Sequence, residues 1–331
     1  MDIKGWFAGA GAKQNFRRLL FSYNSIVILL LLFFFATFFV NRFSRNYETV
    51  IYEACLYGFL AIGLGMVMIT GNIDLSVGFQ AASSAVIVVL IVNATGSVPI
   101  GILAGVVTGA VTGAINGAVV AGVGISPLIA TISMNFVYKG FVYYFTRQGS
   151  IYPDGELRDE LRSFIAGMRL FDMKALSLIV LLVFIALLIF TFVLKKTNLG
   201  NNFYVCGDNP EAAKLTGISI RKTVFISYLF CGICCGIAGV FLASNQAAAA
   251  YMFGEGREIF AISACVIGGI KMAGGRGTML NVIIGCLIMR VISTGMNLML
   301  VPAAWTDFVS GALLVAVLVV DKFTTVKKLK E

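Results

Sequence analysis

The sequence contains no histidine and few charged residues. Charged side chains make up 12% of its 331 residues, whereas an ordinary soluble protein carries about 25%. Without histidine, most zinc sites, Ser-His-Asp hydrolysis and histidine proton relays are excluded. So few charges cannot cover a soluble particle of this size. A water-soluble, disordered or nucleic-acid-binding protein is therefore excluded, despite the net charge of +9.

The seven cysteines form no recognisable disulfide scaffold. An odd number without an external cluster argues against one. Cys231, Cys234 and Cys235 have the spacing of a redox motif, but cysteine within a membrane span is usually a small packing residue. We therefore expect no catalytic residue, no metal site and no cofactor in this chain.

Long apolar runs dominate the sequence, which is 59% hydrophobic. A helix needs about 20 mostly apolar residues to cross a bilayer. We predict an all-α integral membrane protein with one transmembrane domain over residues 1–331 and about ten transmembrane helices. The expected spans are 21–40, 50–70, 76–93, 98–122, 127–146, 174–194, 223–245, 259–272, 279–299 and 303–320.

The distribution of basic residues predicts the orientation. With the N-terminus in the cytoplasm, the cytoplasmic segments hold 15 lysines and arginines and the outer segments hold 8. This bias favours both termini in the cytoplasm. The longest outer loop, Arg147–Lys174, contains Leu157, Leu161 and Phe164 at helical spacing, which predicts a short amphipathic helix.

Glycine recurs every fourth residue in the fourth span. This spacing puts the glycines on one face of a helix, where they allow close packing against another helix. The face either packs statically or slides during transport. Its members are Gly101, Gly105, Gly109, Gly113 and Gly117. Gly232, Gly236 and Gly239 in the seventh span indicate a second, weaker series.

A polar turn joins the second and third spans. It contains Gly71, Asp74, Ser76 and Gly78. A carboxylate beside a span is a functional candidate, but Asp74 could equally cap the helix that follows. Gly71 and Gly78 permit tight turning.

The polar segment 195–222 is expected in the cytoplasm. Asn209 suits a helix N-cap, Pro210 the first helical position and Gly217 the C-terminal stop. The pattern predicts a two-turn helix that is too short to be stable alone, so we expect it to dock onto another protein. The candidate docking residues are Asp208, Asn209, Pro210, Glu211, Ala212, Ala213, Lys214, Leu215 and Gly217.

The Gly-rich segment 268–278 fails as a phosphate loop. Gly269 and Gly274 have the right separation, but Gly275 stands where lysine is required. The chain is therefore not expected to hydrolyse ATP.

The charged residues within the expected spans include Lys139, Arg290 and Asp307. Charges in a membrane prefer each other or a wet cavity. Arg290 and Asp307 form a candidate pair, and these three residues with Asn135 are candidates for a translocation path. Tyr138, Asn245 and Gln246 are further candidates for hydrogen bonds to a hydroxylated solute. Snorkelling or a purely structural pair is the alternative.

Three motifs resemble those of the ribose-type permeases of bacterial ABC transporters. They are Ile69–Gly78, the segment Cys206–Ile218, which is similar to an EAA-type coupling loop, and the Gly-rich block Val266–Thr278. The resemblance covers about residues 50–320. Asn72 departs from it, because glycine is usual there, and residues 147–172 match no family feature.

The resemblance implies a permease subunit of a carbohydrate-uptake importer in the bacterial inner membrane, with about ten helices as in large importers of the cobalamin type. The solute is expected to be a monosaccharide or a related small hydroxylated molecule. The implied partners are a second permease subunit, a cytoplasmic ATPase that binds ATP and magnesium, and an extracytoplasmic sugar-binding protein. Residues 208–217 are then expected to press into the ATPase.

Two other functions remain open from the residues. An ion-coupled secondary transporter predicts acidic residues or broken helices near the bilayer midplane, and only Asp74 and Asp307 approach this. An intramembrane enzyme is the second alternative, but this chain offers no histidine and no paired acids for such catalysis.

Overall fold

The structure, a computed structural model, describes residues 24–40, 43–166 and 178–328. The expected cytoplasmic segment 1–20 lies outside these residues, as do residues 167–177 of the expected outer loop.

Helices make up nearly the whole of the described chain. In chain order the elements are α2 (Asn24–Phe39), η1 (Phe43–Arg45), α3 (Tyr47–Ile69), α4 (Val77–Thr95), α5 (Val98–Gly117), the π-helix η2 (Ala118–Val123), α6 (Pro127–Thr146), β1 (Ser150–Ile151), α7 (Leu157–Ala166), α8 (Leu178–Lys196), α9 (Asn198–Asp208), α10 (Pro210–Leu215), α11 (Ile220–Gln246), β2 (Ala249–Ala250), η5 (Tyr251–Phe253), α12 (Arg257–Ile267), α13 (Met279–Leu298) and α14 (Ala303–Lys328). The strands β1 and β2 pair antiparallel.

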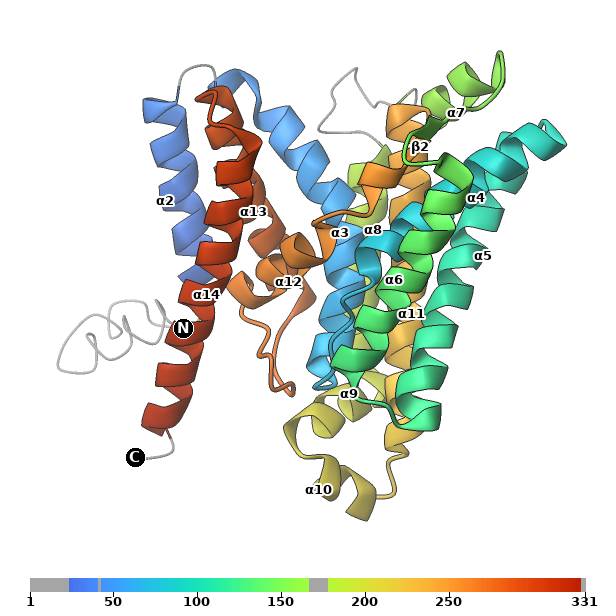
Figure 1. Ribbon diagram of the computed structural model, residues 1–331. Helices are drawn as coiled ribbons and strands as arrows, with labels where there is room; N and C mark the ends of the chain where they lie inside the picture. The colour runs from blue at the N-terminus through green and yellow to red at the C-terminus, as the bar shows by residue number, and fades with distance from the viewer. Residues whose placement is uncertain (1–23, 41–42, 167–177, 329–331) are drawn as a thin grey trace.

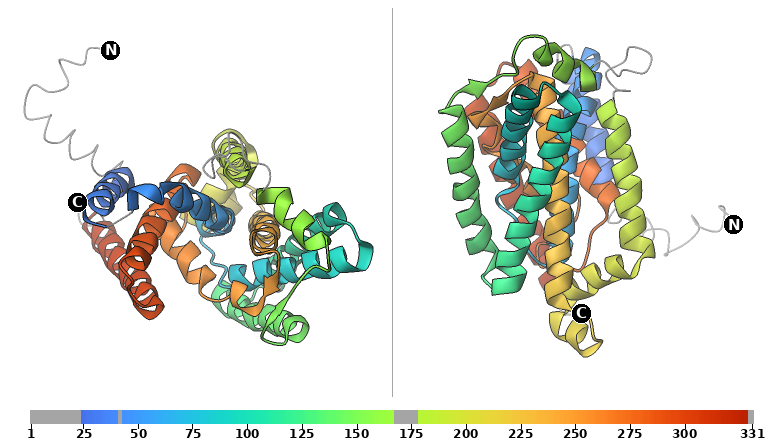
Figure 2. Two further views of the ribbon diagram at one scale, coloured as in Figure 1. Left: turned by 90° about the horizontal axis from the view of Figure 1, so that it is seen from above. Right: turned by 90° about the vertical axis from the view of Figure 1, so that its right-hand side faces the viewer.

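The helices form two groups (Figures 1 and 2). On one side lie α2, α13 and α14, and on the other lie α4, α5, α6 and α11. Between the groups, α3 packs against both α11 and α13, while α12 packs against α13 and α14. The helices α9 and α10 project from one end of the bundle (Figure 1).

Six helical segments of the described residues are long and apolar enough to cross a membrane. They are Tyr47–Ile69, Val77–Thr95, Val98–Val123, Leu178–Lys196, Ile220–Gln246 and Met279–Leu298. Although α6 has 20 residues, it carries several polar side chains and is not among the six. The predicted span 259–272 is not a single spanning helix, because α12 has eleven residues and a rise of about 16 Å, roughly half of a hydrocarbon core.

Local sequence signals account for several helix ends. Pro127 begins α6 as its first residue, where the missing N–H of proline is harmless. Gly96 ends α4 in the left-handed conformation. The amphipathic helix predicted in the outer loop is confirmed as α7, whose Leu161 is fully buried.

The glycine face of α5 lies against α4 and α11. Gly109 and Gly113 approach Gly232 so closely that a Cβ atom on any of the three would overlap the opposite backbone. Nearer the start of α5, Gly101 and Gly105 face valine side chains of α4. Close backbone approach gives the dispersion contacts that hold membrane helices together. The two glycine series therefore bring α4, α5 and α11 into one tightly packed unit.

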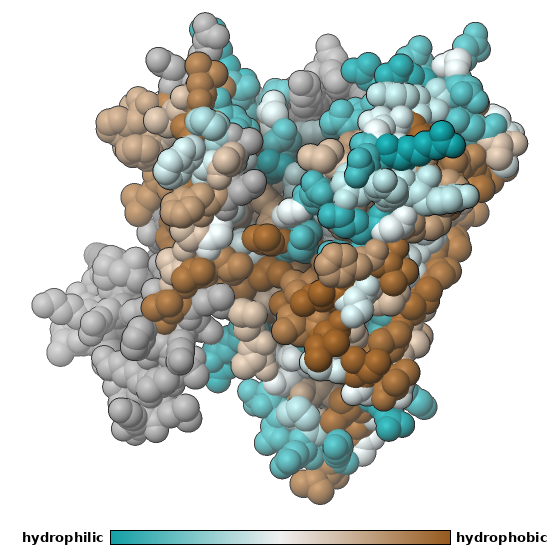
Figure 3. Space-filling view, in the orientation of Figure 1, coloured by the Kyte–Doolittle hydropathy of each residue, from teal (hydrophilic) through white to brown (hydrophobic). Residues whose placement is uncertain are grey.

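Apolar side chains form a broad belt on the outer surface (Figure 3). In the view of Figure 3 the belt crosses the side of α5 and α6, and hydrophilic residues lie beyond it, including at the end that carries α10. Large exposed apolar residues of α6 contribute to it, among them Leu128, Ile129 and Phe136. All seven cysteines are buried and unpaired.

Candidate functional site

The short helix α10 has the end signals that its sequence predicts. The Asn209 side chain accepts hydrogen bonds from the backbone N–H groups of Glu211 and Ala212, both at 3.0 Å. Gly217 ends the segment at φ +80°. Ala213 is buried against the rest of the chain, whereas Leu215 is 89% exposed. A large apolar side chain therefore stands in the open on a helix that projects from the bundle.

Glycines attach α9 and α10 to the end of α3. A Cβ atom on Gly207, near the end of α9, would overlap the carbonyl oxygen of Ile69 and approach the backbone of Gly275. In the same place, Gly274 lies against the backbone of Gly71. Three chain segments meet here with no side chain between them, and we name Gly71, Gly207, Gly274 and Gly275 the glycine junction.

Hydrogen bonds tie the same segments together. The N–H of Gly275 donates to the carbonyl of Ile69 at 2.9 Å, and the Tyr204 hydroxyl of α9 donates to the carbonyl of Gly277 at 2.8 Å. Burial raises the pKa of the Tyr204 phenol, so this donor keeps its proton at neutral pH. The three motifs, which are far apart in the sequence, thus share one site at the base of the bundle.

Asp74 lies inside the bundle, whereas its position in a polar turn between two expected spans predicts an exposed place at their ends. The chain turns at Gly71 and rises back along the bundle before α4 begins (Figure 1). Asp74 is fully buried and contacts Asn116. Val123 is the end of η2. Asn116 lies about 10 Å before it along the helix axis. The prediction was wrong because the non-helical residues 72–74 lead back into the bundle before α4 begins (Figure 1).

Four hydrogen bonds reach the Asp74 carboxylate. Its Oδ1 accepts from the Ser76 N–H at 2.9 Å and from the Ser76 hydroxyl at 2.6 Å. Its Oδ2 accepts from the amides of Gln80 at 2.8 Å and Asn116 at 3.1 Å. Both amides also donate to the Ser76 hydroxyl, at 2.9 and 2.8 Å. With its acceptor positions occupied, this hydroxyl donates its own proton to Asp74.

Every neighbour donates a hydrogen bond to Asp74. Its carboxyl oxygens are the acceptors in each of these contacts. A carboxylate offers about four lone-pair positions, and the protein fills them. No lysine or arginine of the described chain forms an ion pair with it. Asp74 accepts from the N–H of Ser76, the residue before α4, and binds side chains of α4 and α5, so sequence reasoning identified only part of its environment.

The network extends from Asp74 to α6 and α11. The Tyr138 hydroxyl of α6 contacts the Asn116 side-chain oxygen at 2.9 Å and the Thr112 carbonyl at 3.0 Å. The Tyr228 hydroxyl of α11 donates to the Ile73 carbonyl at 2.7 Å. Tyr138 is therefore occupied within the protein and is unavailable to a solute. Sequence reasoning missed Gln80 and Asn116, whose polar side chains within apolar runs were the only signal.

Gly78 brings the start of α4 close to α12. A Cβ atom on Gly78 would overlap the carbonyl oxygen of Gly254 and lie 2.8 Å from a carboxylate oxygen of Glu258. That oxygen of Glu258 is buried and has no hydrogen-bond partner among the described residues. Gly78 is thus a close-contact position and not a turn.

Two of the candidate path residues lie on one face of α6. Asn135 and Lys139 are one helical turn apart, and Lys139 Nζ is 3.4 Å from Glu255 Oε1. Lys139 also lies 5.4 Å from the centre of the Tyr251 ring. The side-chain oxygen of Asn135 is buried without a hydrogen-bond partner among the described residues, so this face carries polar groups that the protein itself does not fully satisfy.

Arg290 belongs to a different pair. Its Nη1 is 3.3 Å from Glu53 Oε2 of α3, and its guanidinium lies 4.1 Å from the centre of the Tyr57 ring. The side chain of Asp307 lies outside the described residues, so the Arg290–Asp307 pair stays a prediction. Asn245 accepts from the Tyr52 hydroxyl at 2.9 Å and thus joins α3 to α11.

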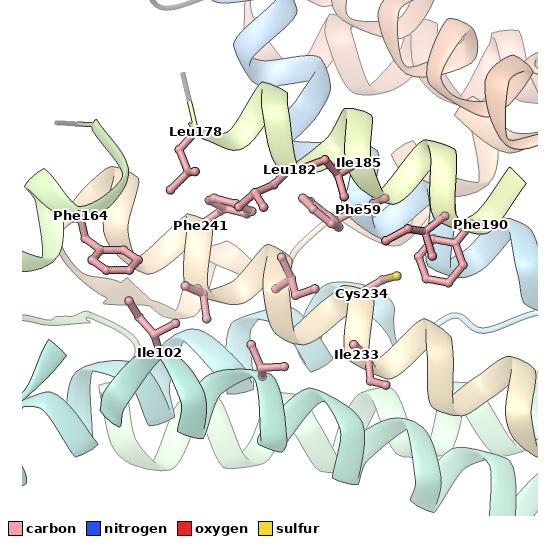
Figure 4. A pocket seen from close by; sticks show the side chains of 15 residues that line it. Phe59, Ile102, Phe164, Leu178, Leu182, Ile185, Phe190, Ile233, Cys234 and Phe241 are labelled. Atoms are coloured by element: carbon pink, nitrogen blue, oxygen red, sulfur yellow. The ribbon is translucent and has the colours of Figure 1, made fainter. Parts of the chain in front are cut away.

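A cavity lined by apolar residues lies between α8 and the pair α5 and α11 (Figure 4). Its volume is about 400 Å³. Phe59, Phe164, Phe190 and Phe241 are among its lining residues, and the rest of the lining is also apolar. Such a wall offers a hydroxylated solute no hydrogen bond, so this cavity is not a suitable substrate site.

Comparison with known proteins identifies the family. Residues 46–318 match the family model described as "Branched-chain amino acid transport system / permease component". The chain belongs to this family. The permease is 34% identical over 284 residues to the autoinducer 2 import system permease protein LsrC of Photorhabdus luminescens, which covers 84% of this chain and 82% of the relative. It is 33% identical to LsrC of Escherichia coli, over 82% and 78% of the two chains. No solved structure matches it.

These similarities confirm the resemblance in the three motifs. The chain is a permease of a sugar-type ABC importer, it is located in the bacterial inner membrane, and it is not itself an enzyme. Such a permease works with an ATPase and a substrate-binding partner.

Proposed function

We propose that this permease imports autoinducer 2 or a related small hydroxylated solute, driven by a separate cytoplasmic ATPase that docks on α10. The relatives named above import autoinducer 2. In this proposal the chain crosses the membrane about ten times in a fold of the cobalamin-importer type, with both termini and α10 in the cytoplasm. ATP and magnesium bind to the ATPase, whereas this chain contributes no cofactor site.

The exposed apolar tip of α10 is the observation that carries the proposal. An isolated six-residue helix is unstable in water, and here it is capped at both ends and joined to the bundle. Leu215 is 89% exposed, so its apolar side chain is not buried by any part of this chain. A groove on the ATPase that covers Leu215 makes use of this geometry. The glycine junction then passes the movement of α10 to α3 and to residues 268–278.

The face between α6 and α14 suits a second permease subunit. On this face α12 is too short to cross the bilayer, so the non-helical segment that follows it completes the crossing. Irregular backbone is not tolerated against lipid, but it is tolerated against protein or a water-filled path. Ile259 and Met272 are 46% and 40% exposed here, and a second subunit would cover them.

The polar face of α6 is the proposed translocation path. Asn135 and Lys139 lie on it, and cavities adjoin both ends of the helix. One, of about 260 Å³, includes Asn72 and Ser126. The other, of about 610 Å³, is lined by Arg147 and three aromatic residues. Polar groups and aromatic rings can bind the hydroxyl groups and the apolar faces of a sugar-like ring.

An ion-coupled secondary transporter is the alternative. The interrupted helices of this chain agree with that function. Against it, the acceptor positions of the fully buried Asp74 are filled by the protein.

The proposal predicts that Leu215→Asp abolishes ATPase binding. The two permease subunits, ATPase and binding protein are co-expressed, and the ATPase retained on the purified permease is measured beside ATP-dependent uptake in vesicles. We expect at least a tenfold loss of both, and the same from Glu211→Arg, at normal membrane abundance. Leu300→Asp is the matched control, because Leu300 is also 89% exposed and lies in the α13–α14 connection.

Two results would overturn the proposal. The first is normal ATPase retention by Leu215→Asp and Glu211→Arg. The second is solute uptake by vesicles that contain the permease without any ATPase, which would favour the ion-coupled alternative.

A further inference from the structure

A cavity of about 420 Å³ lies between η2 and the start of α11. Its floor consists of small residues, its wall of larger apolar ones, and its rim of two cations. The lining residues are Ala118, Ala121 and Gly122 of η2, and Arg221, Lys222, Phe225 and Ile226 of α11. The cavity is at the end of the bundle that carries α9 and α10 (Figure 1).

The two rim cations occupy an electrostatically unfavourable position. Arg221 and Lys222 lie in the first turn of α11, which contains no acidic residue, and the Ser219 side chain makes no cap hydrogen bond. The first turn of a helix carries free N–H groups and a partial positive charge, so cations are destabilising there. Both side chains are exposed, and neither forms an ion pair within the described chain. An anion at the rim would relieve this repulsion.

The apolar residues of the wall and floor favour an apolar occupant. Phe225 and Ile226 stand beside the two cations, and the small residues of η2 leave the space open. Ile115 and Val123, which lie close to the lining residues of η2 along the chain, are apolar and 41% and 73% exposed. π-Helical turns are rare and occur often at functional sites. A site with two cations next to an apolar hollow on the lipid-facing side matches an amphiphile better than a soluble anion.

We propose that this cavity binds an anionic phospholipid. The phosphate headgroup lies between Arg221 and Lys222 at the first turn of α11, and the start of an acyl chain packs against Phe225 and Ile226. Basic pockets between membrane helices bind anionic headgroups in this way. The inference goes beyond the transport function, and no ATPase or solute is needed for it.

Lipid quenching of a tryptophan placed in the wall tests this site. Phe225→Trp is made in the full chain with Trp6→Phe and Trp305→Phe, which replace its two tryptophans, and the protein is reconstituted into vesicles. Brominated phosphatidylglycerol and brominated phosphatidylcholine are compared as quenchers. Each cation near an anionic surface contributes a several-fold preference. We therefore expect half-maximal quenching at a roughly tenfold lower mole fraction of phosphatidylglycerol.

Matched charge variants assign the preference to the rim. Arg221→Gln with Lys222→Gln should abolish it. Lys195→Gln with Lys196→Gln should leave it intact, because these exposed lysines lie in the last turn of α8 and outside the cavity. Equal quenching by the two lipids, or an equal loss in both double variants, would refute the proposal.

A second measurement does not depend on correct folding of the Phe225→Trp variant. The chain with native Phe225 is unfolded thermally in neutral detergent, with added phosphatidylglycerol, phosphatidylcholine or inorganic phosphate. We expect phosphatidylglycerol alone to raise the midpoint, and only when Arg221 and Lys222 are present. Equal stabilisation by inorganic phosphate would show a soluble-anion site, and no stabilisation by any of the three would also count against the lipid.

Discussion

The α3–α4 connection is held in opposite ways at its two ends. At Gly71, three segments touch through backbone alone, with no side chain to give way. Around Asp74, side-chain hydrogen bonds tie α4, α5 and α6 together, and the Tyr228 hydroxyl of α11 donates to the neighbouring Ile73 carbonyl. The first arrangement suits the transmission of movement, because a displaced backbone displaces its neighbour. The second suits a fixed block, because moving one partner leaves a buried polar group unsatisfied.

The difference divides the permease into a part that is moved and a part that resists movement. The glycine junction joins α10 to α3 and to residues 268–278. The Asp74 network joins α4, α5, α6 and α11, which the glycine faces of α5 and α11 pack still closer. Movement of α10 is thus expected to reach α3 and α12 first, relative to a rigid block.

Asp74→Ala should produce the largest loss. It leaves the N–H and hydroxyl of Ser76 without their acceptor and takes one of two acceptors from the amides of Gln80 and Asn116, and each unsatisfied buried donor costs about 1–3 kcal/mol. We expect a destabilisation of about 3–5 kcal/mol, measured as a lower thermal midpoint in detergent and lower membrane abundance. Asp154→Ala is the control, since Asp154 is exposed. An unchanged midpoint would show that the network is not the rigid element.

Gly207→Ala should damage function more than stability. The added methyl group meets the carbonyl of Ile69 and the backbone of Gly275, so the junction must open, at a cost of about 1–3 kcal/mol. We expect uptake to fall at least tenfold while the assembled complex still hydrolyses ATP. Gly311→Ala is the control, because nothing lies near its added methyl group. Normal uptake by Gly207→Ala would exclude the junction as a transmission point.

The Lys139–Glu255 pair should have the smallest effect on stability. Its side chains are 36% and 40% exposed, and such pairs contribute below about 1 kcal/mol. A double-mutant cycle of Lys139→Gln and Glu255→Gln should give a coupling energy within that limit. The same variants should raise the KM for uptake, because Lys139 lies on the proposed path. A coupling energy as large as the effect of Asp74→Ala would place this pair in the rigid block.

Local structure was predictable from the sequence where a few adjacent residues determine it. Asn209, Pro210 and Gly217 specify the ends of α10 within ten residues, and Pro127 specifies the start of α6. The spacing of Leu157, Leu161 and Phe164 predicted α7. In each case the signal and the structure lie in the same short segment.

The site itself was not predictable, because its parts come from distant segments. Polar residues beside an apolar run are typical of a surface turn, and the partners that hold Asp74 inside the bundle lie on α4 and α5. The same limit applies to α12, whose apolar run resembles a full span until the bend at Gly268 is known. The three motifs were visible in the sequence, but their meeting at the glycine junction depends on the packing of α3 and α9.

The burial of every native thiol has a practical consequence. Water-soluble maleimides find no accessible cysteine on the folded permease, so a single cysteine introduced at Leu215 or Leu300 becomes the sole target of the reagent. Labelling of whole cells before and after permeabilisation then reads out which compartment each end of the bundle faces. The natural chain is already the background that such topology mapping requires.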